Sequence, residues 1–194
     1  MGRLDREFYQ QDTLQVARGL LGKLLVRVLN GQRLSGYAVE TEAYIGEEDK
    51  ACHASRGRTV RTEVMYGPGG HAYVYLIYGV HHCLNVVTER EGFPAAVLIR
   101  AIEPWEGLDQ MKRNRPGRSD KELTNGPGKV CQALKIDRQL NGVDLCRSEV
   151  LFIEEGKEIA QEDIVVTPRI GIKSDELAKL LPWRFYLRDS SFVG

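Results

Sequence analysis

The order of the predicted elements favours an α+β domain built around an antiparallel or mixed β-sheet. Strand-like segments follow one another with helices inserted at intervals, without strict β-α-β alternation. Hairpin signals at residues 30–31 and 78–79 join strands that are neighbours in the chain. With 194 residues, the chain is most simply one domain and can bury a sizeable core.

The composition excludes several classes of protein. Basic and acidic side chains number 27 each, so any binding to nucleic acid must use a local basic patch. The four cysteines form no CxxC pair, and the polar start of the chain is unlike a secretory signal. No apolar run approaches the length of a membrane span. We therefore expect a cytoplasmic protein with reduced thiols.

The first predicted elements are a helix and a hairpin. Asp12 and Thr13 can cap the helix, and Gly22 can end it. Residues 23–29 and 32–42 then alternate as paired strands do. The Asn-Gly pair between them is the strongest hairpin signal in the chain.

Two acids and an aromatic residue close the second strand of this hairpin, in the segment Val39–Tyr44 (VETEAY). Glu40 and Glu42 lie one strand period apart, so they share a face, which Tyr44 continues. We expect these side chains at the end of a paired strand, where rigid backbone would hold a site.

The segment 45–68 shows no clear period. It contains His53 and three arginines, Arg56, Arg58 and Arg61. Structureless stretches of this length in a compact domain are usually functional or disordered. The arginines suit contacts with backbone phosphates, or they form a solvated loop face. The sequence leaves these two alternatives open.

Aromatic residues are concentrated in the stretch 69–85 (GGHAYVYLIYGVHHCLN). Tyr78-Gly79 interrupts the apolar run and predicts a hairpin turn, with residues 80–87 as the returning strand. An aromatic side chain at a hairpin tip is poorly placed for a core and well placed to enter a base stack. A core hairpin whose tyrosine hydroxyls face water is the alternative, and this stretch alone favours it.

The next segment, residues 94–102 (PAAVLIRAI), predicts a buried strand with Arg100 inside it. An unpaired buried charge is costly, so this arginine needs a paired acid or a water-filled site. A structural salt bridge is the more common explanation. We expect a helix to open at Glu103-Pro104 and to run to about Arg113, with Trp105 on its inner face.

Short elements complete the chain. Residues 124–129 (TNGPGK) lead into a helix that ends near residue 134, and Lys129 at its start could hold a backbone phosphate. The spacing is not that of a nucleotide-triphosphate loop. Ser174 can cap a further short helix. Strands are predicted at residues 149–153, 164–167 and 183–188.

Other catalytic and metal-binding patterns are missing from the sequence. It contains no G-x-S-x-G elbow, no H-x-E…P-C-x-x-C deaminase signature and no G-x-G-x-x-G after a strand. Zinc binding by residues 52–53 together with residues 81–83 is disfavoured, because adjacent side chains on a strand point to opposite faces. We expect no metal site.

Several separated motifs occur in a combined order that resembles one known family. The motifs are Val39–Tyr44 (VETEAY), Asp49 with His53, Met65 with Pro68-Gly69, Ala72–Gly79 (AYVYLIYG), Cys83–Asn85 (CLN), Val97–Glu103 (VLIRAIE), Gly126–Leu134 (GPGKVCQAL) and Arg184–Tyr186 (RFY). From about residue 5 to its end, the chain resembles the alkyladenine DNA glycosylases, also called 3-methyladenine or methylpurine DNA glycosylases. The resemblance implies one α+β domain with a curved, mainly antiparallel sheet, peripheral helices and a protruding hairpin.

The resemblance also implies a reaction and a partner. The family excises damaged purines after flipping the nucleotide out of double-stranded DNA, without a metal or an organic cofactor. We expect this chain to act as a monomer, in a bacterial-type cytoplasm, where DNA binding would associate it with the nucleoid. Alkylated purines are the expected substrates. Hypoxanthine and ethenoadenine depend on fine details of the pocket.

Catalytic roles follow for the positions that match the family's motifs. Glu42 resembles the general base that activates water. Arg100 and the main-chain carbonyl of Ile170 resemble the groups that help to hold this water. Hydrolysis of an N-glycosidic bond needs such a carboxylate near C1′ and a positioned water. No lysine is placed by motif to form a Schiff base, so we predict a monofunctional enzyme that leaves an abasic site.

Binding roles follow in the same way. Tyr44, His53 and Tyr75 resemble the walls of the base pocket. Asn85 resembles the residue that bars a guanine 2-amino group, and Tyr78 resembles the residue that intercalates where the flipped nucleotide was. Tyr73 is expected to pack within the sheet.

Two alternatives compete with this interpretation. A formyltransferase-like RNA-binding module would perform no base excision, and Glu42 and Arg100 would then form a structural ion pair. A hydrolase of free nucleosides would leave the exposed Tyr78 and the basic clusters without a role. Release of free base from methylated DNA, or activity on nucleosides without DNA, distinguishes the three.

Overall fold

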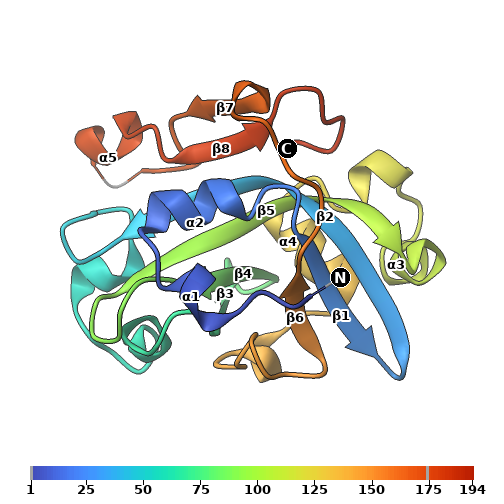
Figure 1. Cartoon of the computed structure of the whole chain (residues 1–194), viewed down its shortest axis with the longest axis horizontal. Coiled ribbons are helices and arrows are strands. Elements are labelled where there is room, and N and C mark those ends of the chain that lie inside the picture. The colour runs from blue at the N-terminus through green and yellow to red at the C-terminus, as the bar shows by residue number, and fades with distance from the viewer. Residues whose placement is uncertain (1, 174) are drawn as a thin grey trace.

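The computed structural model describes residues 2–173 and 175–194, and its sheet is arranged around the long strand β2 (Gln32–Ile45). One edge of β2 pairs with β5 (Ala95–Glu106). The other edge pairs first with β1 (Leu24–Leu29) and then with β8 (Arg184–Leu187). The sheet therefore forks along β2 (Figure 1). Register shifts against β5 mark irregularities of the β-bulge type, which bend and twist a strand.

The remaining strands extend the sheet on both sides. The order is β3-β4-β5-β2-β1-β6, and β8 also pairs with β7. Every pairing is antiparallel, which confirms the predicted α+β fold with a curved, mainly antiparallel sheet. The bounds of these strands are β3 Ala72–Ile77, β4 His81–Val87, β6 Leu151–Glu154 and β7 Ile164–Thr167.

Short helices surround the sheet. Asp12 caps the second of them as predicted, by accepting hydrogen bonds from two backbone N–H groups of its first turn. None of the helices in residues 2–173 and 175–194 is long and apolar enough to cross a membrane. The helices are α1 Arg6–Tyr9, α2 Thr13–Gly19, α3 Leu108–Asn114, α4 Pro127–Leu134 and α5 Glu176–Leu180.

Ser174, the expected cap of the last helix, lies outside the described residues. Asp175 caps α5, because its carboxylate accepts a hydrogen bond from the Ala178 N–H at 2.8 Å. The segment 45–68, in which the sequence shows no period, contains two 3₁₀ helices, η1 (His53–Arg56) and η2 (Glu63–Tyr66).

The predicted helix at residue 103 is wrong in its first turn. β5 continues through Glu106, and Pro104 pairs with Gly36 of β2. Helix α3 begins only after Gly107, which has a φ of 76°. Trp105 was expected to face the core but is 62% exposed. Pairing with the long central strand outweighs the local helix preference of this segment.

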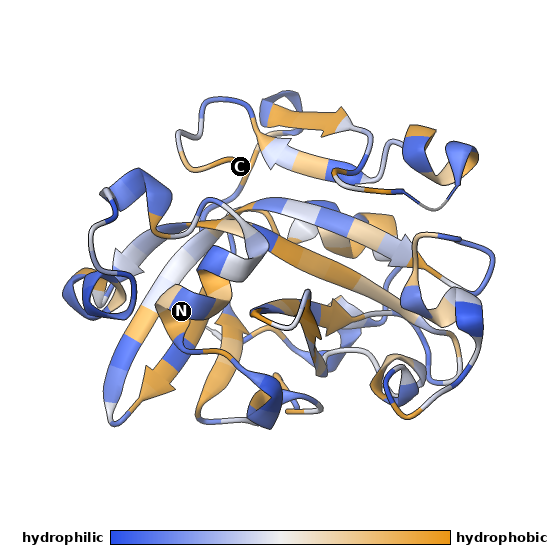
Figure 2. Ribbon diagram, turned by 180° about the vertical axis from the view of Figure 1, so that it is seen from behind, coloured by the Kyte–Doolittle hydropathy of each residue, from blue (hydrophilic) through white to orange (hydrophobic). Residues whose placement is uncertain are grey.

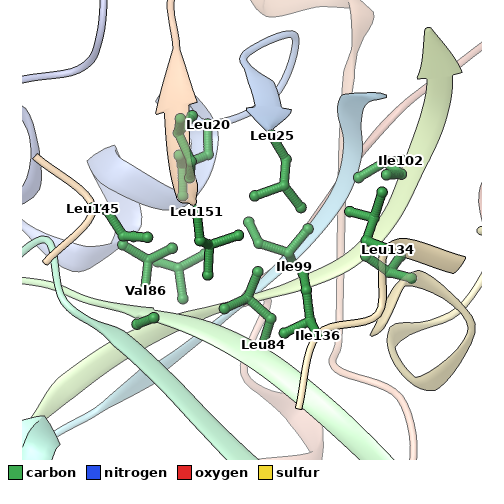
Figure 3. Packing of buried hydrophobic residues seen from close by; sticks show 14 of the residues in the cluster. Leu20, Leu25, Leu84, Val86, Ile99, Ile102, Leu134, Ile136, Leu145 and Leu151 are labelled. Carbon is green, nitrogen blue, oxygen red and sulfur yellow. The ribbon is translucent and has the colours of Figure 1, made fainter. Parts of the chain in front are cut away.

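The main core lies between the sheet and helices α2 and α4. Figure 3 shows side chains of β1, β4, β5 and β6 meeting those of Leu20, directly after α2, and Leu134 of α4. In Figure 2 the apolar residues are concentrated on the central strands, and the peripheral loops are mostly hydrophilic. The largest fully buried members include Leu20, Leu25, Leu84, Ile99, Ile102 and Leu134.

Candidate active site

Glu42 has a completely buried side chain in the forked part of the sheet. Its Oε1 accepts a hydrogen bond from the Ile170 N–H at 2.7 Å. Its Oε2 accepts from the Tyr44 hydroxyl at 2.8 Å and from Arg100 Nη1 at 3.2 Å. The sequence predicted this carboxylate at the end of a paired strand. Because β2 runs on to Ile45, the carboxylate lies within the strand instead. The structure thus brings together the three predicted catalytic residues.

Ile170 contacts Glu42 through a different group from the one that was predicted to act. Its N–H binds the carboxylate. The contact of its carbonyl with a water stays a prediction.

Glu40 is the second acid of this cluster and is also completely buried. Its Oε1 accepts hydrogen bonds from Arg100 Nε at 2.7 Å and from Arg184 Nε at 2.6 Å. Burial by itself lowers the pKa of Arg100, but the charges of Glu42 and Glu40 outweigh it and raise this pKa. Arg100, which the sequence predicted to need a paired acid, is therefore paired with two acids, Glu40 and Glu42.

Tyr44 joins the acid cluster to the neighbouring cavity. Burial, followed by the charge of Glu42, raises the pKa of Tyr44 well above its usual value. Its hydroxyl therefore stays protonated and donates to the carboxylate at neutral pH.

A cavity of about 290 Å³ opens beside these groups, at the small end of the range for small-molecule sites. Tyr44, Arg100 and Ile170 line it, so its wall includes the three residues that donate hydrogen bonds to Glu42. The structure places every residue predicted for the base pocket in its wall: Tyr44, His53, Tyr75 and Asn85.

His53 is fixed in this wall by two tyrosines. Its Nδ1 lies 2.9 Å from the Tyr73 hydroxyl, and its ring meets the Tyr75 ring edge-on at 4.5 Å. Burial, and then the charges of Arg61 and Arg56, lower the pKa of His53 to about 4. The imidazole is therefore neutral at neutral pH. Tyr73 is buried in the sheet as predicted, and in addition it orients His53 and lines the cavity.

Asn85 lies deeper in the pocket, with only 3% of its surface exposed. Its strand β4 runs between β3 and β5, where Asn85 pairs with Tyr73 on one side and with Leu98 on the other. The side-chain Nδ2 donates to the Tyr73 carbonyl at 3.2 Å. This bond fixes the amide group, so Asn85 presents a rigid polar surface to the cavity.

Tyr78 stands at the rim of the cavity, at the tip of the hairpin between β3 and β4. It is 79% exposed and has a φ of 52°, followed by a φ of 72° at Gly79. Two central residues with positive φ are typical of tight hairpin turns. A positive φ is uncommon for a bulky aromatic residue, so this turn holds Tyr78 in a strained conformation.

The predicted phosphate-binding residues differ in their surroundings. Arg58 is paired with Glu63 at 2.6 Å. The Arg61 guanidinium lies 5.2 Å from the centre of the Tyr75 ring, beside the pocket. Lys129 donates to the Asn125 side chain at 2.8 Å, and Arg56 borders a neighbouring hollow with Arg61. Three of the four basic side chains therefore have no acidic partner among the ion pairs of the described residues.

Asp49 and Arg169 form an ion pair that the sequence analysis did not find. Both side chains are completely buried, and their closest atoms are 2.6 Å apart. Arg169 lies in an apolar turn (PRIGI), so the reasoning that singled out Arg100 could have singled out Arg169 too. The acidic partner could not be predicted, because the two residues are far apart in the chain. Arg184, the second partner of Glu40, was missed for the same reason.

Comparison with known proteins places this chain in a family. The family model described as methylpurine-DNA glycosylase matches residues 7–191. A protein of Methanocella arvoryzae is 55% identical over 192 residues, which cover 98% of this chain and 95% of the relative. A protein of Desulfitobacterium hafniense is 54% identical over 203 residues, covering 100% and 99%. Both bear the name "Putative 3-methyladenine DNA glycosylase".

These likenesses cover the whole fold and every residue of the cluster around Glu42. They define the class of protein as a DNA repair enzyme of the glycosylase type. More particularly, the chain belongs to the methylpurine-DNA glycosylase family. The resemblance noted in the sequence is thereby confirmed.

Proposed function

We propose that this protein is a monofunctional glycosylase that removes alkylated purines, such as 3-methyladenine and 7-methylguanine, from double-stranded DNA. Water attacks C1′ of the flipped nucleotide, the bond from C1′ to the purine nitrogen breaks, and the base leaves with the bonding electrons. Glu42 takes the proton of the water, and an abasic site remains. The observation that carries this proposal is a buried carboxylate, Glu42, whose three hydrogen-bond donors all line one aromatic pocket.

Glu42 has the hydrogen-bonding capacity for this role. An ionised carboxylate can accept about four hydrogen bonds. Among the described residues, three donors already bind the Glu42 carboxylate: Ile170, Tyr44 and Arg100. They fix the orientation of the carboxylate and leave room for one more donor. In the proposed reaction this donor is the attacking water.

The pocket suits a cationic purine. A ring methylated at N3 or N7 carries a positive charge, and the faces of Tyr44 and Tyr75 would attract it by roughly 0.5–2 kcal/mol. His53 is neutral at neutral pH, so it does not repel such a base. A cationic purine is already a good leaving group and needs little acid catalysis. Hypoxanthine and ethenoadenine are neutral and would depend on a hydrogen bond from His53.

The rim of the pocket suits nucleotide flipping. Extruding a nucleotide from a duplex costs a few kcal/mol, least where pairing is already damaged. Insertion of the Tyr78 ring would recover roughly 1–3 kcal/mol of stacking. Asn85, fixed against the Tyr73 carbonyl, would disfavour the 2-amino group of a guanine. 7-Methylguanine has the same amino group, so its positive charge and better leaving ability would have to offset this clash.

The basic residues around the pocket would hold the DNA backbone. Arg56, Arg61 and Lys129 are available for phosphates, whereas Arg58 would have to leave Glu63. Local contacts of this kind are compatible with a net charge of zero. In the proposed function the protein acts as a monomer on the DNA of the nucleoid.

Glu42→Gln tests the proposal, because it removes the charge and keeps the shape. We expect the variant to bind lesion-containing duplex with unchanged affinity and to release no free 3-methyladenine in a single-turnover assay. Thermal melting checks that the buried amide, which meets Arg100, is tolerated. Excision by a folded Glu42→Gln variant would contradict the proposal.

Three further assays separate the alternatives. Borohydride trapping of a covalent enzyme–DNA adduct would contradict the monofunctional reaction. Hydrolysis of free 7-methylguanosine would favour a nucleoside hydrolase. Absence of base release from methylated DNA by the unmodified protein would favour an RNA-binding module.

A further inference from the structure

The buried ion pair between Asp49 and Arg169 lies one residue from the group that binds the proposed catalytic carboxylate. We propose that this pair is a positioning device, which fixes the Ile170 N–H and the Tyr44 ring so that Glu42 is held in one orientation. The inference rests on the proposed role of Glu42.

Arg169 connects three separate parts of the chain. Its Nη1 donates to Asp49 Oδ2 at 2.6 Å, and its Nη2 donates to Asp49 Oδ1 at 2.8 Å. Nη1 also donates to the Ala43 carbonyl of β2 at 2.9 Å, and Nη2 to the Ala178 carbonyl of α5 at 3.3 Å. The guanidinium thus fixes the turn that carries Ile170 to the strand that carries Glu42.

Arg169 also fixes Tyr44. The guanidinium carbon lies 4.8 Å from the centre of the Tyr44 ring and 5.0 Å from that of the Trp183 ring. The Tyr44 hydroxyl and the Ile170 N–H are two of the three donors to Glu42. One side chain therefore places both of them.

Asp49 extends this network toward the part of the pocket wall that contains Ala51 and His53. Its carboxylate accepts hydrogen bonds from the Ile45 N–H at 3.3 Å and the Ala51 N–H at 3.0 Å. These bonds shape the segment that leads directly to His53. The ion pair is therefore shared by the acid cluster and by the base pocket.

A purely stabilising role would not require this chemistry. Removing two charges from water is costly, and well-packed apolar side chains of similar volume often stabilise a protein equally well or better. An arginine–carboxylate fork adds direction, because two parallel hydrogen bonds fix both the position and the plane of the guanidinium. Both the position and the plane of the guanidinium must be fixed if it is to place the Ile170 N–H and the Tyr44 ring.

Asp49→Asn and Arg169→Lys test the inference, with Asp144→Asn as a matched control. Asp144 also accepts from an arginine, Arg6, at 2.6 Å and from a backbone N–H, that of Cys146. Neither Asp144 nor Arg6 lines the pocket. All variants are assayed by single-turnover excision with saturating enzyme, by binding to undamaged duplex, and by thermal melting.

We expect Asp49→Asn and Arg169→Lys to slow excision about 10- to 100-fold, the loss typical of a misplaced catalytic group. Binding to undamaged duplex should stay unchanged. The double variant should be no slower than the slower single variant, because the two residues act as one unit. Asp144→Asn should melt at a lower temperature and excise at the rate of the unmodified protein.

Excision at the unmodified rate by folded Asp49→Asn or Arg169→Lys would overturn the inference and leave a structural ion pair. If Asp49→Asn does not fold, Arg169→Lys alone tests the inference. This variant keeps both charges of the ion pair and loses only the two parallel hydrogen bonds of the guanidinium. Glu42→Gln separates this result from the proposed function. If Glu42→Gln abolishes excision while the ion-pair variants remain fast, only the positioning inference fails.

Discussion

The Tyr44 hydroxyl donates to Glu42 Oε2 over 2.8 Å from a position two residues further along the same strand. Because β2 is paired on both sides at Glu42, neither residue can move without the sheet. A wall of the base pocket and the proposed catalytic carboxylate therefore form one rigid unit. Tyr44 and Glu42 are two residues apart on one strand, so the strand geometry fixes their relative position. A substrate that contacts the Tyr44 ring is therefore held at a fixed position relative to the Glu42 carboxylate.

Tyr44→Phe removes this donor and keeps the ring. A hydrogen bond to a charged group contributes about 1.5–3 kcal/mol, so we expect excision to slow by roughly 10- to 150-fold. Affinity for a duplex with a cationic lesion should persist, because the aromatic face remains. Single-turnover kinetics and fluorescence anisotropy measure the two quantities. A variant that loses affinity and keeps its rate would show that Tyr44 acts in binding alone.

His53 predicts a dependence of stability on pH. Its pKa falls from a usual value of 6.5 to about 4, because it is buried and lies near Arg61 and Arg56. Between these two pH values the unfolded chain binds a proton that the folded chain does not. The free energy of unfolding should therefore rise with pH across this window, with the contribution of His53 complete above 6.5 and lost near pH 4.

His53→Gln should remove that part of the slope. Urea unfolding of both proteins, at pH values from about 4 to about 7.5, compares the two slopes directly. Identical slopes would mean that the imidazole titrates equally in the folded and unfolded chains. The comparison cancels all other titrating groups, which both proteins share.

Tyr78→Asn tests the intercalation that is proposed for the hairpin tip. Asparagine tolerates a positive φ better than most residues, so the turn should keep its shape while the ring is lost. We expect affinity for lesion-containing duplex to fall about 5- to 150-fold, the equivalent of 1–3 kcal/mol of stacking. Thermal melting should show an equally or more stable protein. Unchanged lesion affinity and rate would exclude intercalation by this residue.

Arg61→Ala and Arg58→Ala test which basic side chains bind phosphate. Each phosphate contact contributes about 0.9 to the slope of log affinity against log salt. We expect Arg61→Ala to lose one such contact and Arg58→Ala to lose less, because Arg58 already binds Glu63. Anisotropy titrations with undamaged duplex at several salt concentrations give the slopes. A larger loss for Arg58→Ala would show that its ion pair opens on DNA.

The strands could be predicted from the sequence because their patterns are local, whereas the pocket walls were predicted only through the resemblance to a family. The Asn-Gly turn and the alternation on either side of it predict the first hairpin, and residues 164–167 match β7 in both bounds. Tyr44, His53, Tyr75 and Asn85 were placed together by a family resemblance, and all four line one cavity.

What could not be predicted depends on contacts between distant segments. A helix was expected at residue 103, but Pro104 pairs with Gly36 in the sheet, and no local sequence pattern predicts this pairing. The partners Asp49 and Arg169 meet only after β2, α5 and the turn before Ile170 have come together. Their burial is a property of the assembled sheet, not of either segment.

The span of the Glu42 cluster has a consequence for folding. Glu42 binds Arg100 from 58 residues away and Ile170 from 128 residues away. Closing loops of this length costs entropy before any contact compensates for it, so such contacts form slowly. The carboxylate therefore acquires its last donor only when the C-terminal strands dock onto β2. We expect a chain that is still emerging from the ribosome to be inert toward DNA, and recovery of base release to be the last event in refolding.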